Sequence, residues 1–491
     1  MTPYDEVRYP GHPYPQTHPS RLAAIARLFG LTPAPPERCR VLEIACGDAA
    51  NLIPLAWGSP RSEFVGFDLA QTPIEAGRQV AAQLRLTNLS LSAMDLRDFP
   101  PDTSRFDYII AHGLYSWIPG PLHGELLALV ARHLAPHGVA FISYNTYPGC
   151  YIRRMVWEML RFHVEHLSGP DQRAAEAQAL LRLLADGQSH LNDYGTLLRA
   201  EASRVLERDP GYLLHDDLAD INEPVYFHQF LDRAESHGLQ YLGEAELGAM
   251  STAGIKPAVR AVLEPLEPLL REQYLDFVRG RQFRQTLLCG SGLTVDRVPR
   301  PERLDGLLIG ASVKAQIVAR DSQDEQSLKA LMDVLQEHHP LRLGMPEALA
   351  LTERRIGGLP AGTRPDYLRD LALLAVRAGA VEVYANAPAL TLDPGERPVA
   401  SELARLQNEE GMTVTNLCHE PVKLDTDLAR SLLALLDGTR DRAQLINELG
   451  ERLGDAPDRA QSLEQNLRNL GRLALLVSSA GTYPPSSSPS S

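Results

Sequence analysis

The chain has 491 residues, of which 44% are hydrophobic, and this is enough for about three domains with buried cores. Its 62 acidic residues outnumber its 48 basic ones, and the net charge of −14 excludes general attraction to nucleic acid or anionic lipid. Only four basic residues are lysines, and none precedes Lys256, which excludes a lysine base in the first half of the chain.

The five cysteines are odd in number, far apart and free of any C-x-x-C pair. They predict neither a disulfide framework nor a zinc site. The chain does not begin with a basic stretch followed by an apolar one, as a signal peptide would. It also contains no apolar run of about 18 residues. We therefore expect a soluble, cytoplasmic protein with no membrane insertion.

Residues 1–149 alternate short apolar runs with helical patterns, which is typical of a parallel sheet with crossover helices. The predicted strands cover residues 40–45, 63–68, 89–94, 106–112 and 139–145. Helices are expected over residues 71–86 and 123–134. The pattern predicts an α/β fold with a doubly wound, Rossmann-like sheet.

From residue 150 the apolar residues recur at helical spacing, so residues 150–212 are predicted to be a helical insertion. Alternation returns at 239–244 and 283–289, and region 213–298 should complete the sheet, because an uncovered edge is a liability. Helices followed by a strand then indicate two small winged-helix-like modules, over 299–390 and 398–478. The proline- and serine-rich tail, 479–491, is expected to be disordered.

A ten-residue segment, Val41-Leu-Glu-Ile-Ala-Cys-Gly-Asp-Ala-Ala50, places an acid near a strand end and then small residues that lead into a helix. Such a turn lets backbone N–H groups approach a ligand at a helix start. Asp68 and Asp95 end the second and third strands, and an acid after the second strand can bond ribose hydroxyls. Three acids are thus expected to face one crevice.

This segment resembles the E-x-G-x-G-x-G motif of class I S-adenosylmethionine-dependent methyltransferases, with Ala45 and Ala49 replacing two glycines. The resemblance implies S-adenosylmethionine as cofactor, with its methionine moiety at Gly47, its ribose at Asp68 and its adenine beside Asp95. A nicotinamide-binding Rossmann domain is the alternative, and the crowding of acids where pyrophosphate would lie disfavours it. The full set of implied cofactor residues is Glu43, Ala45, Gly47, Asn51, Asp68, Leu69, Met94, Asp95, Leu96 and His112.

Further motifs resemble bacterial methyltransferases that carry a methyltransferase regulatory domain, over about residues 4–290. The matching runs include His12-Pro-Tyr-Pro-Gln-Thr-His-Pro19, His112-Gly-Leu-Tyr-Ser-Trp-Ile-Pro119, His215-Asp-Asp-Leu218 and Asn222-Glu-Pro-Val-Tyr-Phe227. The characterised members of that family methylate lysines of outer-membrane proteins. The resemblance therefore implies a protein acceptor and a homodimer formed through the helical insertion.

Aromatic residues follow the fourth and fifth predicted strands, where a methyl acceptor meets the cofactor in such a sheet. Aromatic faces and hydroxyls suit an amine acceptor through cation–π contacts and hydrogen bonds. The predicted catalytic residues are Tyr115, His112, Trp117 and Tyr144, with Tyr115 positioning the nitrogen and His112 as a candidate proton acceptor. A structural role for His112 and loop packing for Trp117 are the alternatives, and no metal site is expected.

Two other functions are compatible with the sequence. The modules could make the chain a cofactor-sensing regulator without activity, or the acceptor could be a small amine or hydroxyl compound. Neither C-terminal module presents a basic recognition helix, so they are predicted to bind protein rather than nucleic acid. The sequence does not determine the acceptor, the number of methyl groups added, the oligomeric state or what these modules bind.

Overall fold

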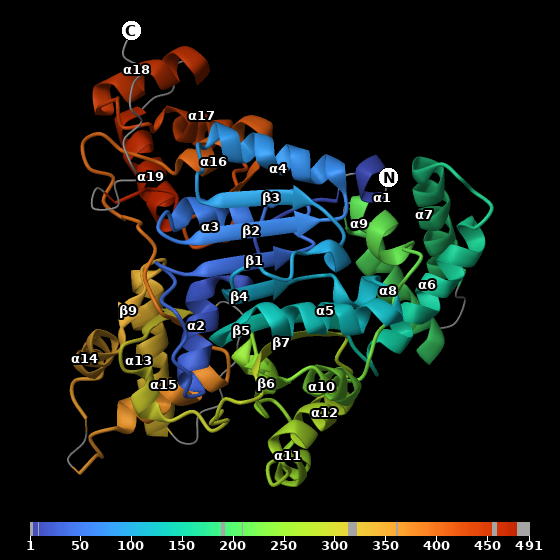
Figure 1. Cartoon of the computed structure of the whole chain (residues 1–491). Coiled ribbons are helices and arrows are strands. Elements are labelled where there is room, and N and C mark those ends of the chain that lie inside the picture. The colour runs from blue at the N-terminus through green and yellow to red at the C-terminus, as the bar shows by residue number, and fades with distance from the viewer. Residues whose placement is uncertain are drawn as a thin grey trace.

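The computed structural model describes residues 3–7, 9–187, 192–208, 210–312, 322–359, 362–453 and 459–478. A seven-stranded sheet forms its centre, in the order β3-β2-β1-β4-β5-β7-β6 (Figure 1). Its strands are β1 (Arg40–Ile44), β2 (Glu63–Asp68), β3 (Leu89–Ala93), β4 (Phe106–Ala111), β5 (Leu134–Asn145), β6 (Leu239–Glu244) and β7 (Phe283–Gly290). The first five strands are parallel, and β7 runs antiparallel to both β5 and β6.

The predicted sheet is confirmed, including its completion by two strands from beyond the insertion. The largest difference is at β5, which begins at Leu134 rather than at residue 139. Pro136 and Gly138 make that stretch resemble a turn, yet Leu134 still pairs with Phe106 across an irregularity in the ladder. Strand pairing therefore includes the start of β5, although the local sequence there favours a turn.

Helices cover both faces of the sheet, as a doubly wound fold requires. They are α2 (Pro19–Leu28), α3 (Leu52–Gly58), α4 (Gln71–Gln83), α5 (Gly120–His133), α10 (Phe227–Ser236) and α12 (Pro268–Arg279). Ile25, Leu52 and Ile74 belong to one hydrophobic core, while Val130 and Phe230 belong to a second. Each face of the sheet thus buries its own apolar set.

The described part of the insertion is helical, and its long helices lie beyond the carboxyl ends of the strands (Figure 1). They are α6 (Cys150–Val164), α7 (Pro170–Asp186) and α8 (Asp193–Leu206). Leu160, Leu181 and Leu198 are fully buried in a separate hydrophobic core. The insertion is therefore a packed unit that overhangs the end of the sheet where a ligand would bind.

The middle module has a three-stranded sheet in the order β10-β8-β9. Its elements are β8 (Leu308–Ala311), α13 (Ser322–His338), β9 (Leu343–Gly344), α14 (Met345–Arg355), α15 (Tyr367–Arg377) and β10 (Val381–Tyr384). Its apolar residues join the core on the α2 face of the main sheet, and buried Arg21 of α2 pairs with Glu382 at 3.2 Å. This module is continuous with the core of the main sheet, which the sequence pattern did not predict.

The C-terminal module has its own hydrophobic core and a two-stranded sheet. Its elements are α16 (Glu402–Glu410), β11 (Thr413–Thr415), β12 (Pro421–Lys423), α17 (Asp427–Leu435), α18 (Arg442–Leu453) and α19 (Arg459–Arg472). The predicted disordered tail, 479–491, lies outside the described residues. Among the described helices, none combines the length and apolarity needed to span a bilayer.

Candidate functional site

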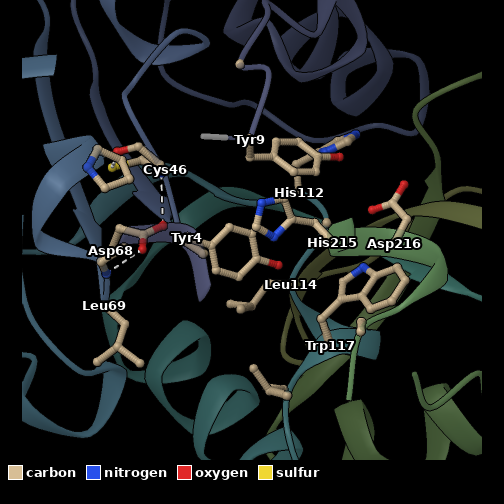
Figure 2. Close-up of a pocket in the computed structure, with 18 of the residues that line it drawn as sticks. Tyr4, Tyr9, Cys46, Asp68, Leu69, His112, Leu114, Trp117, His215 and Asp216 are labelled. Carbon is tan, nitrogen blue, oxygen red and sulfur yellow. Dashed lines mark hydrogen bonds between the residues drawn. The ribbon is translucent and has the colours of Figure 1, made fainter. Parts of the chain in front are cut away.

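A cavity of about 1130 Å³ opens at the carboxyl ends of β1, β2 and β4. Figure 2 shows Cys46, Asp68 and Leu69 on one side of it and Trp117, His215 and Asp216 on the other. All ten residues that the sequence assigns to the cofactor line this cavity. Their roles in binding remain a prediction, but the fold brings the whole set together.

The loop after β1 bends sharply through three residues with left-handed backbone angles. Ala45, Gly47 and Ala49 have φ values of 58°, 56° and 58°. The two alanines thus occupy conformations that glycine adopts at lower cost. A Cβ at Gly47 would meet no atom within 4 Å, whereas one at Gly77 of α4 would lie 2.6 Å from the Asp48 carbonyl oxygen. The loop therefore leaves space above Gly47 and packs tightly against α4.

Asp68 ends β2 and ties the two adjacent loops together. Its Oδ2 accepts a hydrogen bond from the Gly47 N–H at 2.9 Å, and its Oδ1 accepts one from the Ala70 N–H at 2.8 Å. Burial raises the pKa of this carboxyl, and the backbone N–H groups oppose that shift. The carboxylate keeps further lone pairs with which it can accept hydrogen bonds from a ligand.

Glu43 lies at the end of β1 and is 4% exposed. Its Oε1 accepts a hydrogen bond from Asn51 Nδ2 at 2.8 Å, while its buried Oε2 has no hydrogen-bond partner among the described residues. Burial raises the pKa of Glu43 to about 8. Glu43 lines the cavity, so its carboxyl group is a candidate partner for a ligand that donates hydrogen bonds.

Asp95 lies beside Met94 and Leu96 on the cavity wall, but its carboxylate is already paired. Both of its oxygens accept hydrogen bonds from the Arg97 guanidinium, at 2.9 and 2.6 Å. Those bonds lower the pKa of Asp95 to about 2, so it stays ionised at neutral pH. A ligand at this wall would share the carboxylate with Arg97.

The four predicted catalytic residues separate into two pairs. His112 and Trp117 line the cavity, whereas Tyr115 and Tyr144 do not. Tyr115 is fully buried, and its hydroxyl accepts a hydrogen bond from Arg233 at 3.1 Å. Tyr144 is 1% exposed and bonds Thr286. The structure does not bring these two tyrosines to the cavity, because both side chains point into the core between the sheet and α10.

His112 lies in an aromatic stack within the cavity wall. Its ring is 3.7 Å from that of Tyr14 and 5.7 Å from that of Phe141, measured between centroids. Burial lowers the pKa of His112 to about 3, so the ring is neutral at physiological pH. A neutral ring with so low a pKa is suited to accepting a hydrogen bond and poorly suited to removing a proton from an ammonium group.

Sequence reasoning missed two groups of cavity residues. Tyr4 and Tyr9 come from the N-terminal segment, and His215 and Asp216 come from a π-helical turn, Leu213–Asp217. The Tyr4 and His215 rings stack at 4.4 Å, which joins the two groups across the cavity. His215 and Asp216 fall in a run that matches the related methyltransferases, whereas Tyr4 and Tyr9 precede the matching run that begins at His12. Nothing in the spacing of the two groups indicates a shared site.

The cavity fits S-adenosylmethionine by the chemistry of its lining. Glu43 and Asp68 supply carboxyl groups for the amine and the hydroxyls of the ligand, and the open Gly47 turn leaves room beside the backbone. Within the described part of the chain, no cluster of His, Cys, Asp or Glu could hold a metal ion.

Three family models match the sequence. They describe a methyltransferase domain over residues 41–138, a predicted methyltransferase regulatory domain over 209–290 and the C-terminal winged helix domain of PKMT over 396–469. Two uncharacterized proteins of Rickettsia prowazekii are similar. One is 28% identical over 91% of this chain and 85% of its own length, and the other is 35% identical over 49% of this chain and 96% of its own length.

The solved structure of PKMT2 from Rickettsia typhi matches with a TM-score of 0.83 and 25% identity, over 96% of this chain and all of that one. The same protein in complex with AdoHcy matches with a TM-score of 0.82. Fold and site together define a class I S-adenosylmethionine-dependent methyltransferase. More particularly, the chain belongs to the family of methyltransferases that carry a methyltransferase regulatory domain and a PKMT winged helix domain.

Proposed function

We propose that this enzyme transfers a methyl group to the side-chain nitrogen of a lysine in a protein, with outer-membrane proteins as the acceptor class. The observation that carries the proposal is the second end of the cavity, where Trp117, Tyr9 and Asp216 face the acids of the first end. Aromatic faces beside a carboxylate suit an amine that arrives as a cation. The whole-length likeness to a protein named PKMT2, the abbreviation for a protein-lysine methyltransferase, supports the same acceptor.

Asp216 is the proposed acceptor-side acid. Its side chain is 15% exposed, and it pairs with Arg208 at 3.3 Å and Arg153 at 3.8 Å. Burial raises its pKa despite these arginines. A carboxylate with a raised pKa is a better proton acceptor for an ammonium group than neutral His112.

The bound cofactor supplies an electrophilic methyl carbon on a sulfonium. We assign to Asp216 the removal of one proton from the lysine ammonium, either directly or through water. The freed nitrogen lone pair then attacks the methyl carbon in line with the carbon–sulfur bond, whose electrons return to sulfur and leave a neutral thioether. Because the reaction needs no covalent enzyme intermediate, the chain's contribution is positioning, desolvation and proton removal.

The test combines two variants of the full-length chain. Asp216→Asn should retain AdoHcy binding by titration calorimetry and lose at least tenfold in methyl transfer to protein, whereas Asp68→Ala should lose both. Mass spectrometry after reaction of labelled cofactor with a cell extract should find label on lysine in proteins. Label confined to small molecules, or to protein residues other than lysine, would overturn the proposal.

A second acceptor class is favoured by one observation. Arg153 and Arg173 line the insertion side of the cavity, and within the described part of the chain the buried Nε of each has no hydrogen-bond partner. A guanidinium group binds a carboxylate through two parallel hydrogen bonds, so a small carboxylic acid is the competing methyl acceptor. Trans-aconitate 2-methyltransferase of Streptomyces coelicolor is 24% identical over 52% of this chain and 71% of its own length. Methyl esters are cleaved by mild base and N-methyl groups are not, so base treatment of the products separates the two.

We also propose that the helical insertion mediates a homodimer. Phe162 of α6 and Leu183 of α7 are 77% and 67% exposed. Large apolar side chains with such exposure are candidates for an interface. Light scattering should show a dimer that Phe162→Glu weakens, while the exposed Val298→Glu outside the insertion does not. An unchanged mass for Phe162→Glu and a monomeric wild type would each contradict this proposal.

A further inference from the structure

The C-terminal module contacts the cofactor end of the cavity through one buried histidine. His419 lies in the turn between β11 and β12 and is 3% exposed. Its Nε2 is 2.8 Å from Oδ1 of Asn51, a residue of the cavity wall 368 positions earlier in the chain. The C-terminal module is therefore connected directly to the methyltransferase domain at its ligand site.

The orientation of the Asn51 amide is determined by its neighbours. Its Oδ1 accepts a hydrogen bond from the Tyr14 backbone N–H at 2.8 Å, and its Nδ2 donates to Glu43 Oε1 at 2.8 Å. The Tyr14 group can only donate, so Oδ1 is an acceptor and the His419 ring must present Nε2–H. A chain of hydrogen bonds thus runs from His419 through Asn51 to Glu43.

The turn that carries His419 is built to present it. His419 has a left-handed φ of 64°, a conformation that is uncommon for residues other than glycine but in which histidine, asparagine and aspartate are enriched. The Asn416 side chain stabilises the turn by accepting the N–H groups of Cys418 and Glu420, each at 2.9 Å. The reinforced turn therefore holds the His419 side chain in a defined position.

We infer that His419 is a positioning residue for cofactor binding: it holds the Asn51 amide, which in turn orients the Glu43 carboxyl at the cavity wall. The C-terminal winged helix module is then part of the cofactor site and not only a docking surface for protein. This inference rests on the assignment of the cavity to the cofactor and is independent of the acceptor.

The test is titration calorimetry of AdoHcy on the full-length chain, which needs no acceptor. His419→Asn suits the left-handed backbone but is too short to reach Asn51, so we expect about tenfold weaker binding, the effect of one lost hydrogen bond of about 1.4 kcal/mol. His419→Gln places an amide N–H near the position of Nε2 and should restore binding to within about threefold of the wild type. Lys423→Ala on exposed β12 is the matched control and should bind as the wild type does.

A double-mutant cycle separates positioning from general support of the fold. In an Asn51→Ala background, His419→Asn should weaken AdoHcy binding by less than about twofold, because the group it positions is gone. Unfolding in urea checks that every variant is folded. The inference is overturned if His419→Asn binds like the wild type, if His419→Gln binds as weakly as His419→Asn, or if the His419→Asn effect persists without the Asn51 amide.

Discussion

The carboxylate of Asp68 accepts a hydrogen bond from the backbone N–H of Gly47 at 2.9 Å, and this bond joins the ends of β2 and β1 at the cavity wall. The same side chain is thus both a predicted cofactor-binding group and a group that stabilises the loop beside the cofactor.

Asp68→Ala should weaken AdoHcy binding by roughly ten- to a hundredfold, because it removes a charged acceptor and releases the Gly47 loop. Titration calorimetry provides the measurement. Asp102→Ala, at an exposed position, is the control and should bind normally. An unchanged affinity for Asp68→Ala would show that the ligand does not use this end of the cavity.

Tyr115→Phe should lower stability rather than turnover. The hydroxyl bonds only Arg233 among the described contacts, so its loss should cost about 1 kcal/mol of unfolding free energy and leave kcat within about twofold. Trp117→Leu, in contrast, alters a side chain that lines the cavity and should lower kcat/KM for a protein acceptor by roughly tenfold or more. Urea unfolding and steady-state kinetics on both variants decide the matter, and a large fall in kcat for Tyr115→Phe would restore its catalytic assignment.

Glu43 should make the unfolding free energy fall as pH rises. Its folded pKa is raised by burial from 4.5 to about 8, so between these values the folded chain holds a proton that the unfolded chain has released. The stabilising contribution is complete below pH 4.5, declines through this window and levels off above pH 8. Glu43→Gln keeps the bond to Asn51 but cannot ionise, so it should lack this decline, a difference of a few kcal/mol between pH 5 and 8. Parallel slopes for the two proteins would contradict the assignment.

Ala45→Gly should stabilise the apo protein. Ala45 has a φ of 58°, and glycine adopts this conformation without the clash of a Cβ. We expect a gain of up to about 1 kcal/mol in unfolding free energy, reduced by the greater freedom of glycine in the unfolded chain. Ala81→Gly, inside α4, is the control and should be destabilising by about 1 kcal/mol. Chemical denaturation followed by circular dichroism measures both, and a loss of stability for Ala45→Gly would mean that the Ala45 conformation carries little strain.

The sequence by itself determined the sheet and the cofactor end of the cavity. Apolar alternation locates β2 at the predicted residues. The acids Glu43, Asp68 and Asp95 come together at the cavity because parallel strands end at one edge of a sheet. These features depend on local periodicity and on a topological rule, and both can be recognised from the amino-acid sequence alone.

Outside the cofactor end, only the tertiary structure decided which side chains face the cavity. Tyr115 and Trp117 are two residues apart in one short 3₁₀ turn, yet Tyr115 enters the core while Trp117 enters the cavity. Tyr4 and Asp216 reach the same cavity from distant segments, and His419 contacts Asn51 of its wall. The direction of a side chain in a turn, and the contact of segments hundreds of residues apart, depend on packing between elements, and sequence periodicity carries no information about either.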